Sequence, residues 1–254
     1  MHTIILGSGS KGNSTLIIGE DKKILIDVGF SYPRMKLLLQ KYNILLEEID
    51  AILLTHTHKD HIGGLKTFEK KNMIPIYTNS LMLKEIENTL GEVNTILCDD
   101  EFDIGNFHVD TIHTSHDAVG SVGFIINCNN EGLVYITDTG YINHKYLEKM
   151  HNKNVYIFES NHDVEMLMTG PYPDVLKRRV ISDKGHLSNE QAGNYLKEII
   201  GDNTKKIILA HLSEINNTPE IALKTVKDII GENILITTAK QDETLDLDDI
   251  IKIM

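Results

Sequence analysis

One short segment constrains this chain more than any other. Residues 55 to 61 read Thr-His-Thr-His-Lys-Asp-His and directly follow the apolar run Ala51 to Leu54. His56 and His58 are two residues apart, which does not suit one face of a helix, so we expect a buried strand that ends in a loop. Neutral imidazole binds first-row divalent ions, and a nearby carboxylate widens the choice toward harder ions. The segment therefore predicts a metal site. The alternative, a run of surface histidines, does not explain why three histidines and Asp60 follow a hydrophobic strand.

The length and composition are those of an ordinary globular protein. The 254 residues are 41% hydrophobic and 24% charged, with no linker or repeat, so we expect a single domain over residues 1 to 254. The N-terminus offers only the short apolar stretch Thr3 to Leu6, which indicates neither secretion nor membrane spanning. Cys98 and Cys128 are isolated, as is typical of a reducing compartment. We therefore expect a cytoplasmic protein that has no membrane partner, and no protein partner is indicated.

Hydrophobic patterning predicts a chain richer in strands than in helices. The expected strands are Thr3 to Leu6, Thr15 to Ile18, Ile24 to Val28, Ala51 to Thr55, Phe107 to Thr114, Val122 to Cys128, Leu133 to Thr137, Val155 to Glu159, Lys206 to Ala210 and Asn233 to Thr238. The expected helices are Tyr32 to Tyr42, Ser80 to Thr89, Asn143 to Lys149, Asn189 to Ile200 and Pro219 to Ile230. This balance favours an α+β fold in which two sheets pack face to face with helices outside.

The net charge limits how the chain could hold nucleic acid. A formal charge of −12 argues against a broad basic surface for phosphates. A bound cation reverses the local sign of an acidic site, so an acidic protein can still hold a phosphodiester. Residues 177 to 179, Lys-Arg-Arg, are the only dense basic triplet, and Arg178 is a candidate contact to phosphate. A solvated helix face is an equal alternative for this triplet.

The spacing His56-x-His58-x-Asp60-His61 resembles the signature of the metallo-β-lactamase superfamily. Asp27 upstream, and His116, Asp138 and His211 downstream, follow in the order of that superfamily. The resemblance implies a four-layer αββα sandwich that covers almost the whole chain. It also implies two divalent metal ions. The first would be held by His56, His58 and His116, and the second by Asp60, His61 and His211, with Asp138 bridging the two. Zn²⁺ suits the histidines, and the carboxylates also accept Mn²⁺. Asp27 would orient a ligand or form a turn.

Two-metal hydrolysis relies on a bridging water that becomes hydroxide near neutral pH, so no serine or cysteine nucleophile is needed. Asp60 would serve catalysis beside this hydroxide. Glu159 and His186 are the candidates for the acid relay that protonates the leaving group. The order of Glu159, His186 and His211 resembles that of the phosphodiesterase branch of the superfamily. The alternative for His186 is a bystander ahead of a helix capped by Ser188.

Further residues narrow the resemblance to the YycJ/WalJ group of bacterial metallo-hydrolases. The residues that carry it are the front loop from Ser8 to Ser14, Glu159-Ser160-Asn161-His162-Asp163, residues 170 to 173 and Gly185-His186-Leu187-Ser188-Asn189. The group implies a phosphodiesterase or 5′-to-3′ DNA exonuclease, with DNA as the substrate. Ser10, Asn13 and His162 are candidate substrate contacts, although a plain turn or a structural role explains them about as well. Two other functions stay open: a lactonase or thioesterase of the same fold, and a metal-binding regulator without catalysis.

Overall fold

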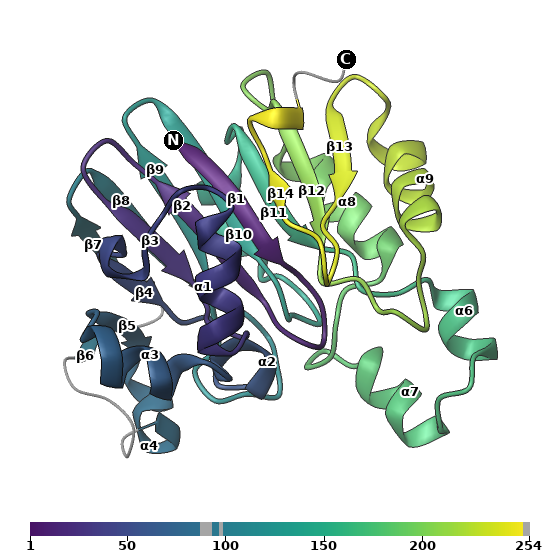
Figure 1. Ribbon diagram of the computed structural model, residues 1–254. Helices are drawn as coiled ribbons and strands as arrows, with labels where there is room; N and C mark the ends of the chain where they lie inside the picture. Colours follow the sequence, from purple (N-terminus) through teal and green to yellow (C-terminus); the bar gives the residue numbers. More distant parts are fainter. Residues whose placement is uncertain (87–92, 97–98, 251–254) are drawn as a thin grey trace. The chain divides into compact units, whose positions relative to one another are not determined.

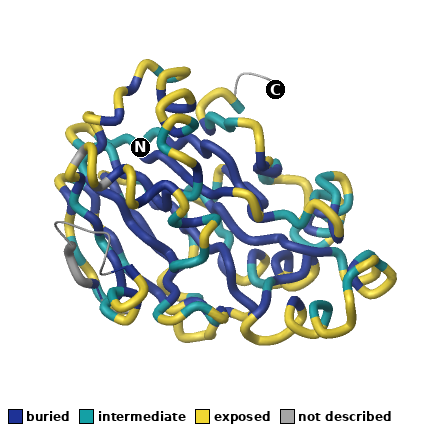
Figure 2. The backbone as a smooth tube through the Cα atoms, turned by 60° about the horizontal axis from the view of Figure 1, so that its bottom comes forward, coloured by how far each residue is buried: buried dark blue, intermediate teal, exposed yellow. Residues whose placement is uncertain are grey.

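A computed structural model describes residues 1–86, 93–96 and 99–250 (Figure 1). The chain divides into two compact units. The first comprises Met1–His113, Ala118–Val122 and Lys240–Met254, and the second comprises Thr114–Asp117 and Gly123–Ala239. Within both units the strands are the most buried segments, as the dark blue tube in Figure 2 shows. No helix in the described ranges is both long and apolar enough to cross a membrane.

A seven-stranded sheet forms the centre of the first unit, in the order β14-β1-β2-β3-β4-β5-β6. Its strands are β1 (His2–Gly7), β2 (Ser14–Ile18), β3 (Lys23–Ile26), β4 (Ala51–Leu53), β5 (Ile76–Asn79), β6 (Val93–Ile96) and β14 (Leu245–Asp246). Strands β14, β1, β2 and β3 pair antiparallel, whereas β3, β4, β5 and β6 pair parallel. The antiparallel pair β7 (Glu101–Ile104) and β8 (Phe107–His113) also belongs to this unit. The parallel strands matter most here, because their carboxyl ends meet at one edge.

Short helices connect the strands of the first unit. They are α1 (Tyr32–Gln40), η1 (Leu46–Glu48), α2 (Lys59–Ile62), α3 (Leu65–Asn72), η2 (Ser80–Met82) and α4 (Leu83–Ile86). Helix α1 has a proline in its first turn and buries Met35, Leu38 and Leu39, which share one face at helical spacing. It runs across the sheet beside β1 to β3 (Figure 1). Helix α2 contains the second half of the His56–His61 motif and directly follows the loop after β4.

The second unit is built on a mostly parallel sheet, in the order β13-β12-β11-β10-β9. Its strands are β9 (Val122–Cys128), β10 (Glu131–Ile136), β11 (Val155–Glu159), β12 (Lys206–Ala210) and β13 (Leu235–Thr238). Strands β9 and β10 form an antiparallel hairpin, and β10 to β13 are parallel. All five residues of β12 are buried. This explains why the parallel strands read as continuous apolar runs rather than as alternating ones.

The helices of the second unit are η3 (His144–Tyr146), α5 (Leu147–Met150), α6 (Val164–Thr169), α7 (Asp174–Val180), α8 (Asn189–Ile199) and α9 (Pro219–Ile230). Helices α8 and α9 pack on each other beside β12 and β13 (Figure 1). Ser188 and Gln191 form a capping box at the start of α8, which agrees with the cap expected at Ser188. The cap fixes where α8 begins, and with it the position of the residues immediately before it.

The expected elements are largely found, with instructive differences at their ends. The strand expected to reach Val28 ends at Ile26, because Asp27 leaves the extended conformation with a φ of 60°. The helix expected over Ser80 to Thr89 is present as η2 and α4, and residues 87–89 lie outside the described ranges, as does Cys98. Cys128 is buried in β9. Helices α3, α6 and α7 were not expected, since each is short and carries few buried residues.

Candidate metal centre

In the first unit, parallel pairing brings Asp27 and Thr55 together. Asp27 follows β3 and Thr55 follows β4, and the backbone N–H of Asp27 donates to the carbonyl of Leu53 at 2.9 Å. The Asp27 carboxylate accepts from the backbone N–H of Thr55 at 2.9 Å and from its hydroxyl at 2.8 Å. Both residues are buried, at 0% and 1% exposure. The carboxylate is therefore held rigidly at the carboxyl edge of the sheet.

Asp27 in turn orients His61. Its Oδ2 lies 2.7 Å from His61 Nδ1, so that nitrogen donates its proton and Nε2 keeps the lone pair. Burial raises the pKa of Asp27, and the contact with His61 opposes that rise. Asp27 was expected either to orient a ligand or to form a turn. The contact with His61 Nδ1 is one that a ligand-orienting carboxylate makes.

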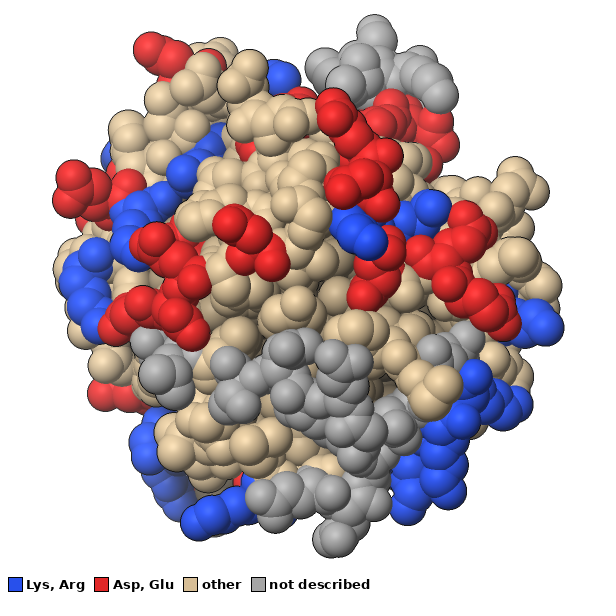
Figure 3. Space-filling view, turned by 90° about the vertical axis from the view of Figure 1, so that its left-hand side faces the viewer, with Lys and Arg blue, Asp and Glu red and all other residues tan. Residues whose placement is uncertain are grey.

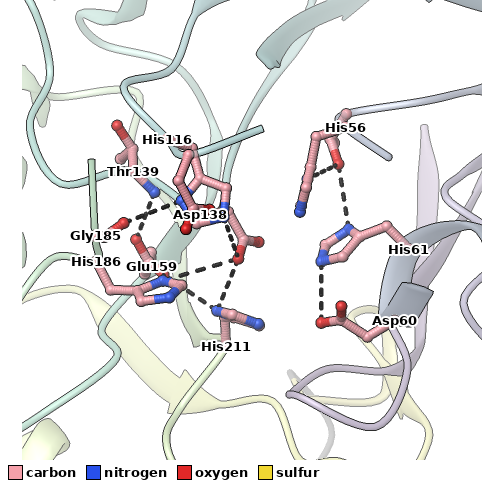
Figure 4. Close-up of polar contacts among 12 residues, drawn as sticks. His56, Asp60, His61, His116, Asp138, Thr139, Glu159, Gly185, His186 and His211 are labelled. Atoms are coloured by element: carbon pink, nitrogen blue, oxygen red, sulfur yellow. Dashed lines mark hydrogen bonds and ion pairs between the residues drawn. The ribbon is translucent and has the colours of Figure 1, made fainter. Parts of the chain in front are cut away.

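The histidines of the motif cluster within the first unit. The ring centroids of His56 and His61 lie 4.0 Å apart, and those of His56 and His58 lie 4.7 Å apart. The Thr55 hydroxyl lies 3.0 Å from Nδ1 of His56. Asp60 Oδ2 lies 3.5 Å from His61 Nε2, as the lower right of Figure 4 shows. Four side chains of the motif, all of types that can bind a metal, thus converge over one loop and the short helix α2.

Asn13 ties the front loop to this motif. Its side-chain amide nitrogen lies 2.9 Å from His61 Nε2 and 3.2 Å from Asp60 Oδ2, and it donates to the Gly9 carbonyl at 3.0 Å. The Gly9 N–H donates back to the Asn13 side chain at 2.8 Å. Asn13 is 1% exposed, so its amide contacts protein groups on all sides. A direct contact between Asn13 and substrate stays a prediction.

The second unit repeats the arrangement at the carboxyl ends of three parallel strands. Asp138 follows β10, Glu159 ends β11 and His211 follows β12. Asp138 and His211 both have a φ of 56°, in the left-handed region that non-glycine residues seldom adopt. This conformation turns each side chain out of the strand directly at the sheet edge. The strained backbone is held because the neighbouring strands are paired up to these residues.

Glu159 is the centre of the second cluster. Its Oε1 lies 2.7 Å from His186 Nδ1 and 3.1 Å from His211 Nδ1, and its Oε2 accepts from the N–H groups of Thr139 and Leu187 (Figure 4). The carboxylate is 0% exposed. Burial alone would raise its pKa, but the adjacent His186 and His211 lower the pKa of Glu159 to about 2. Glu159 is therefore an ionised group that holds two imidazoles in place.

His116 and Asp138 complete this cluster. His116 Nδ1 lies 3.2 Å from the carbonyl of Gly185, so Nδ1 carries the proton. Burial lowers the pKa of His116, which keeps the ring neutral. Asp138 Oδ1 lies 3.4 Å from His211 Nδ1 and 3.8 Å from His116 Nε2. Asp138, Glu159, His186 and His211 offer ligand atoms that all lie within 4.8 Å of one another.

Comparison with known proteins agrees with this geometry. Residues 22–212 match the model of the β-lactamase superfamily domain. Exodeoxyribonuclease YycJ of Bacillus anthracis is 37% identical over 91% of this chain and 90% of its own length. Exodeoxyribonuclease WalJ of Streptococcus pneumoniae is 37% identical over 90% of this chain and 87% of its own length. This chain belongs to the metallo-β-lactamase superfamily. The crystal structure of the metallo-β-lactamase fold protein YhfI from Bacillus subtilis matches 97% of this chain and 100% of its own, with a TM-score of 0.72 and 20% identity.

Membership of the metallo-β-lactamase superfamily confirms the α+β fold that the sequence predicted. It also makes divalent metal binding the natural role of the His and Asp clusters. Whether the side chains suit a cation can be tested on their tautomers. In His61, His116 and His211, Nδ1 faces an oxygen of the protein, so the lone pair that can bind a metal is on Nε2. This is the tautomer that a metal-binding imidazole requires. In His61 this lone pair faces the Asn13 amide nitrogen at 2.9 Å.

The distances between ligand atoms support the same conclusion. Two atoms bound to one Zn²⁺ at about 2.0 to 2.2 Å each lie at most about 4.3 Å apart. His61 Nε2 and Asp60 Oδ2 are 3.5 Å apart in the first unit, and His116 Nε2 and Asp138 Oδ1 are 3.8 Å apart in the second. Both separations are too long for a strong hydrogen bond and fit two ligands of one ion. The residues present therefore fit divalent cations.

The other expected site residues lie in different settings. His186 contacts Glu159, and its side chain is 18% exposed. His162 is buried, its Nδ1 has no hydrogen-bond partner in the described part of the chain, and burial lowers its pKa to about 4. Ser10 is exposed in the front loop, and Arg178 is exposed on α7. The neighbouring Arg179 pairs with Asp117 at 2.6 Å. Substrate contacts by Ser10, Arg178 and His162 stay predictions.

Several residues that support the superfamily site had not been singled out. Thr55 contacts Asp27, His56 and His61, and its place directly before His56 in the motif is a signal that could have found it. Asn161 donates to the carbonyl of His211 at 2.9 Å, and Asn217 donates to the carbonyls of Ser160 and Asn161. Asn217 lies far from these residues in sequence, so no local pattern indicates its role.

Proposed function

We propose that this metal-dependent hydrolase cleaves phosphodiester bonds of DNA and works in the cytoplasm as a 5′-to-3′ exonuclease. The observation that carries the proposal is the Glu159–His186 pair, a buried ionised carboxylate that holds a partly exposed imidazole beside ligand-bearing strand ends. The similarity to two exodeoxyribonucleases over about nine-tenths of the chain supports the choice of DNA. A phosphodiester needs such a proton donor because its alkoxide leaving group is a poor one.

In this proposal the two units form a single domain that holds two divalent cations, Zn²⁺ or Mn²⁺. His56, His58 and His116 would bind one ion, and Asp60, His61 and His211 the other. Asp138 would contribute to both. When bound, such cations lower the pKa of a water molecule and polarise the phosphodiester. The support from the chain is its Nδ1–H contacts to oxygen, which place the ring lone pair on Nε2 of His61, His116 and His211.

His186 is the residue that we assign to proton transfer. Glu159 has a pKa of about 2 and is fully buried, so it keeps its charge and serves to position His186. His186, held by Glu159 through Nδ1, would deliver a proton to the departing 3′ oxygen. After the transfer, neutral His186 remains bonded to Glu159 through Nδ1–H. In this proposal Asp60 would serve catalysis as one of the residues that hold the cations.

The experiment uses the purified protein after metal removal and reloading with Zn²⁺ or Mn²⁺. Metal content by mass spectrometry should be two ions per chain. Oligodeoxynucleotides labelled at the 5′ or at the 3′ end, single- and double-stranded, report activity and polarity. Release of the 5′ nucleotide first is expected. A lactone and a thioester serve as rival substrates: their faster hydrolysis would favour acyl chemistry, and no turnover of any ester with both ions bound would indicate a regulator.

A further inference from the structure

A pocket of about 490 Å³ lies in the first unit beside the metal-binding motif. Its lining includes Ser10 and Lys11 of the front loop, Ser31 ahead of α1, and Lys59 and Asp60 of the motif. Gly29 and Gly63 complete the lining. The volume falls within the range of about 300 to 1,000 Å³ that is usual for small-ligand sites. Asp60 therefore belongs both to the motif and to the wall of this pocket.

The front loop is preorganised rather than loose. Gln241 accepts from the Lys11 N–H at 2.7 Å and donates to the Gly12 carbonyl at 2.8 Å. The Asn13 N–H donates to the Asp60 carbonyl at 2.7 Å. A side chain on Gly29 would place its Cβ 1.8 Å from that same Asp60 oxygen, so the segments touch through backbone alone. The pocket wall is thus held by contacts of the loop, Gly29 and the motif.

The polar groups of the pocket favour an anion. Lys11 and Lys59 are the two basic residues of the lining, and Ser10 and Ser31 are its two hydroxyl-bearing residues. Ser31 precedes α1, and its side chain makes no cap hydrogen bond. The single carboxylate of the lining is Asp60, which is already approached by the Asn13 amide. Two positive charges against one negative charge suit a phosphate monoanion better than a cation or an apolar group.

Some lysines of this unit pair with carboxylates, and others, including Lys59 and Lys66, do not among the described residues. Lys22 pairs with Asp50 at 2.9 Å and Lys23 with Glu48 at 3.1 Å, whereas Lys59 pairs with no carboxylate among the described residues. The face shown in Figure 3 carries both basic and acidic side chains, and neither kind covers the whole face.

We propose that this pocket binds a backbone phosphate of the DNA strand that neighbours the phosphodiester being cleaved. The inference rests on the proposed nuclease function and adds to it a second phosphate site, made by Lys11, Lys59, Ser10 and Ser31. Asp60 forms the boundary between this site and the cations. The site would fix the register of the strand, so that the bond to be cut reaches the metals. Substrates without a second phosphate gain nothing from it.

The first test compares Lys59→Ala and Lys11→Ala with Lys66→Ala, which removes the same charge from an exposed position on α3. KM is measured for a single-stranded oligodeoxynucleotide, and kcat/KM for bis-p-nitrophenyl phosphate, which has only one phosphate. Loss of a charged hydrogen bond should raise KM for the oligonucleotide about tenfold. The kcat/KM for bis-p-nitrophenyl phosphate should stay nearly unchanged in the same variant. Lys59→Arg should restore most of the affinity, and Lys66→Ala should stay near the unaltered protein.

The second test locates the phosphate. Oligonucleotides that carry one neutral methylphosphonate linkage are scanned along the strand by competition binding to the metal-loaded protein. One position next to the cleaved bond should weaken binding about tenfold in the unaltered protein and much less in Lys59→Ala. Inorganic phosphate is titrated as a competitor, and strong competition would show a site for free phosphate instead of the strand.

The two proposals fail in different ways. If the unaltered protein cleaves neither DNA nor bis-p-nitrophenyl phosphate, the nuclease function is wrong. If it cleaves DNA while Lys59→Ala, Lys11→Ala and Lys66→Ala share one KM, the phosphate pocket is wrong and the function stands. The salt dependence adds a check. In a plot of log KM for a single strand against log salt concentration, the slope for Lys59→Ala should be smaller by about 0.7 than the slope for the unaltered protein.

Discussion

Oε1 of Glu159 lies 2.7 Å from Nδ1 of His186, and this contact joins the end of β11 to the segment just before α8. The carboxylate is completely buried, while the imidazole reaches solvent on its other side. A buried anion that holds a partly exposed histidine is suited to stabilise the protonated ring and to leave Nε2 in position for proton transfer. Glu159 is thus placed to orient the ring and His186 to transfer the proton, whereas the sequence had assigned the acid relay to both residues together.

Replacement of His186 should affect substrates according to their leaving groups. His186→Ala should lower kcat for an oligodeoxynucleotide by roughly 100-fold to 10,000-fold, because an alkoxide must be protonated as it departs. The same variant should lose far less on bis-p-nitrophenyl phosphate, whose phenolate leaves without a proton. Steady-state kinetics on both substrates provide the measurement. Equal losses on the two would assign His186 to a structural or metal-binding role instead.

Asp27→Asn should weaken metal binding. The amide retains the size of the carboxylate but removes the charge that holds the Nδ1–H of His61 at 2.7 Å. Loss of such an orienting partner lowers metal affinity by about 10-fold to 100-fold. Competition with a chelating dye measures the affinity, and circular dichroism checks the fold. Asp50→Asn is a suitable control, since Asp50 pairs with Lys22 in the same unit. An unchanged affinity in Asp27→Asn would remove Asp27 from the site.

Gly29→Ala should disrupt the motif through the backbone. The added Cβ would lie 1.8 Å from the Asp60 carbonyl and 2.5 Å from the Asn13 nitrogen, so the segments must separate. We expect a loss of about 1 to 3 kcal/mol in the free energy of unfolding, together with reduced metal content. Gly231→Ala is the matched control, because it is strained by a φ of 88° but meets nothing within 4 Å. It should lose stability and keep its metal, whereas full metal content in Gly29→Ala would contradict the expected displacement.

Stability should fall in alkaline solution because of Tyr156. Burial raises the pKa of its hydroxyl from 10.0 to about 12, and the hydroxyl lies 2.8 Å and 2.7 Å from the carbonyls of Met150 and Ile199. Between pH 10 and 12 the unfolded chain has lost this proton while the folded chain keeps it. The contribution is complete below pH 10 and falls by about 2 to 3 kcal/mol as pH rises through 12.

Urea unfolding at a series of pH values from 8 to 11 measures this dependence. Tyr156→Phe should be less stable at pH 8, since the buried carbonyls lose a donor, and should show a flatter fall above pH 10. Parallel curves for the two proteins would show that Tyr156 does not carry the alkaline effect.

The metal-binding motif could be predicted because its ligands are local. His56, His58, Asp60 and His61 lie within six consecutive residues after an apolar strand, so their proximity needs no knowledge of the fold. Most of the strands were also predictable, since buried parallel strands are continuous apolar runs. Strands β5, β6, β7 and β14 were not expected. Helices α3, α6 and α7 were missed because short helices have weak periodicity and are stabilised by packing.

Whether Asp27 orients a ligand or forms a turn could not be decided from the sequence. The decision comes from the parallel pairing of β3 and β4, which places Asp27 against Thr55 and His61. Asn13 is a similar case. A Ser/Gly/Asn loop predicts a turn or an anion site, and only the contact with residues 60 and 61 shows that its amide supports the motif.

By itself, the sequence determined the metal-binding chemistry and the class of fold, because both follow from residue type, residue order and hydrophobic pattern. Only the tertiary structure decided which groups orient the histidines and that Glu159 stays charged between His186 and His211. The physical reason is that hydrogen-bond partners and burial depend on strand pairing between segments far apart in the chain. A pKa, a tautomer and a pocket are properties of that environment and of no single residue.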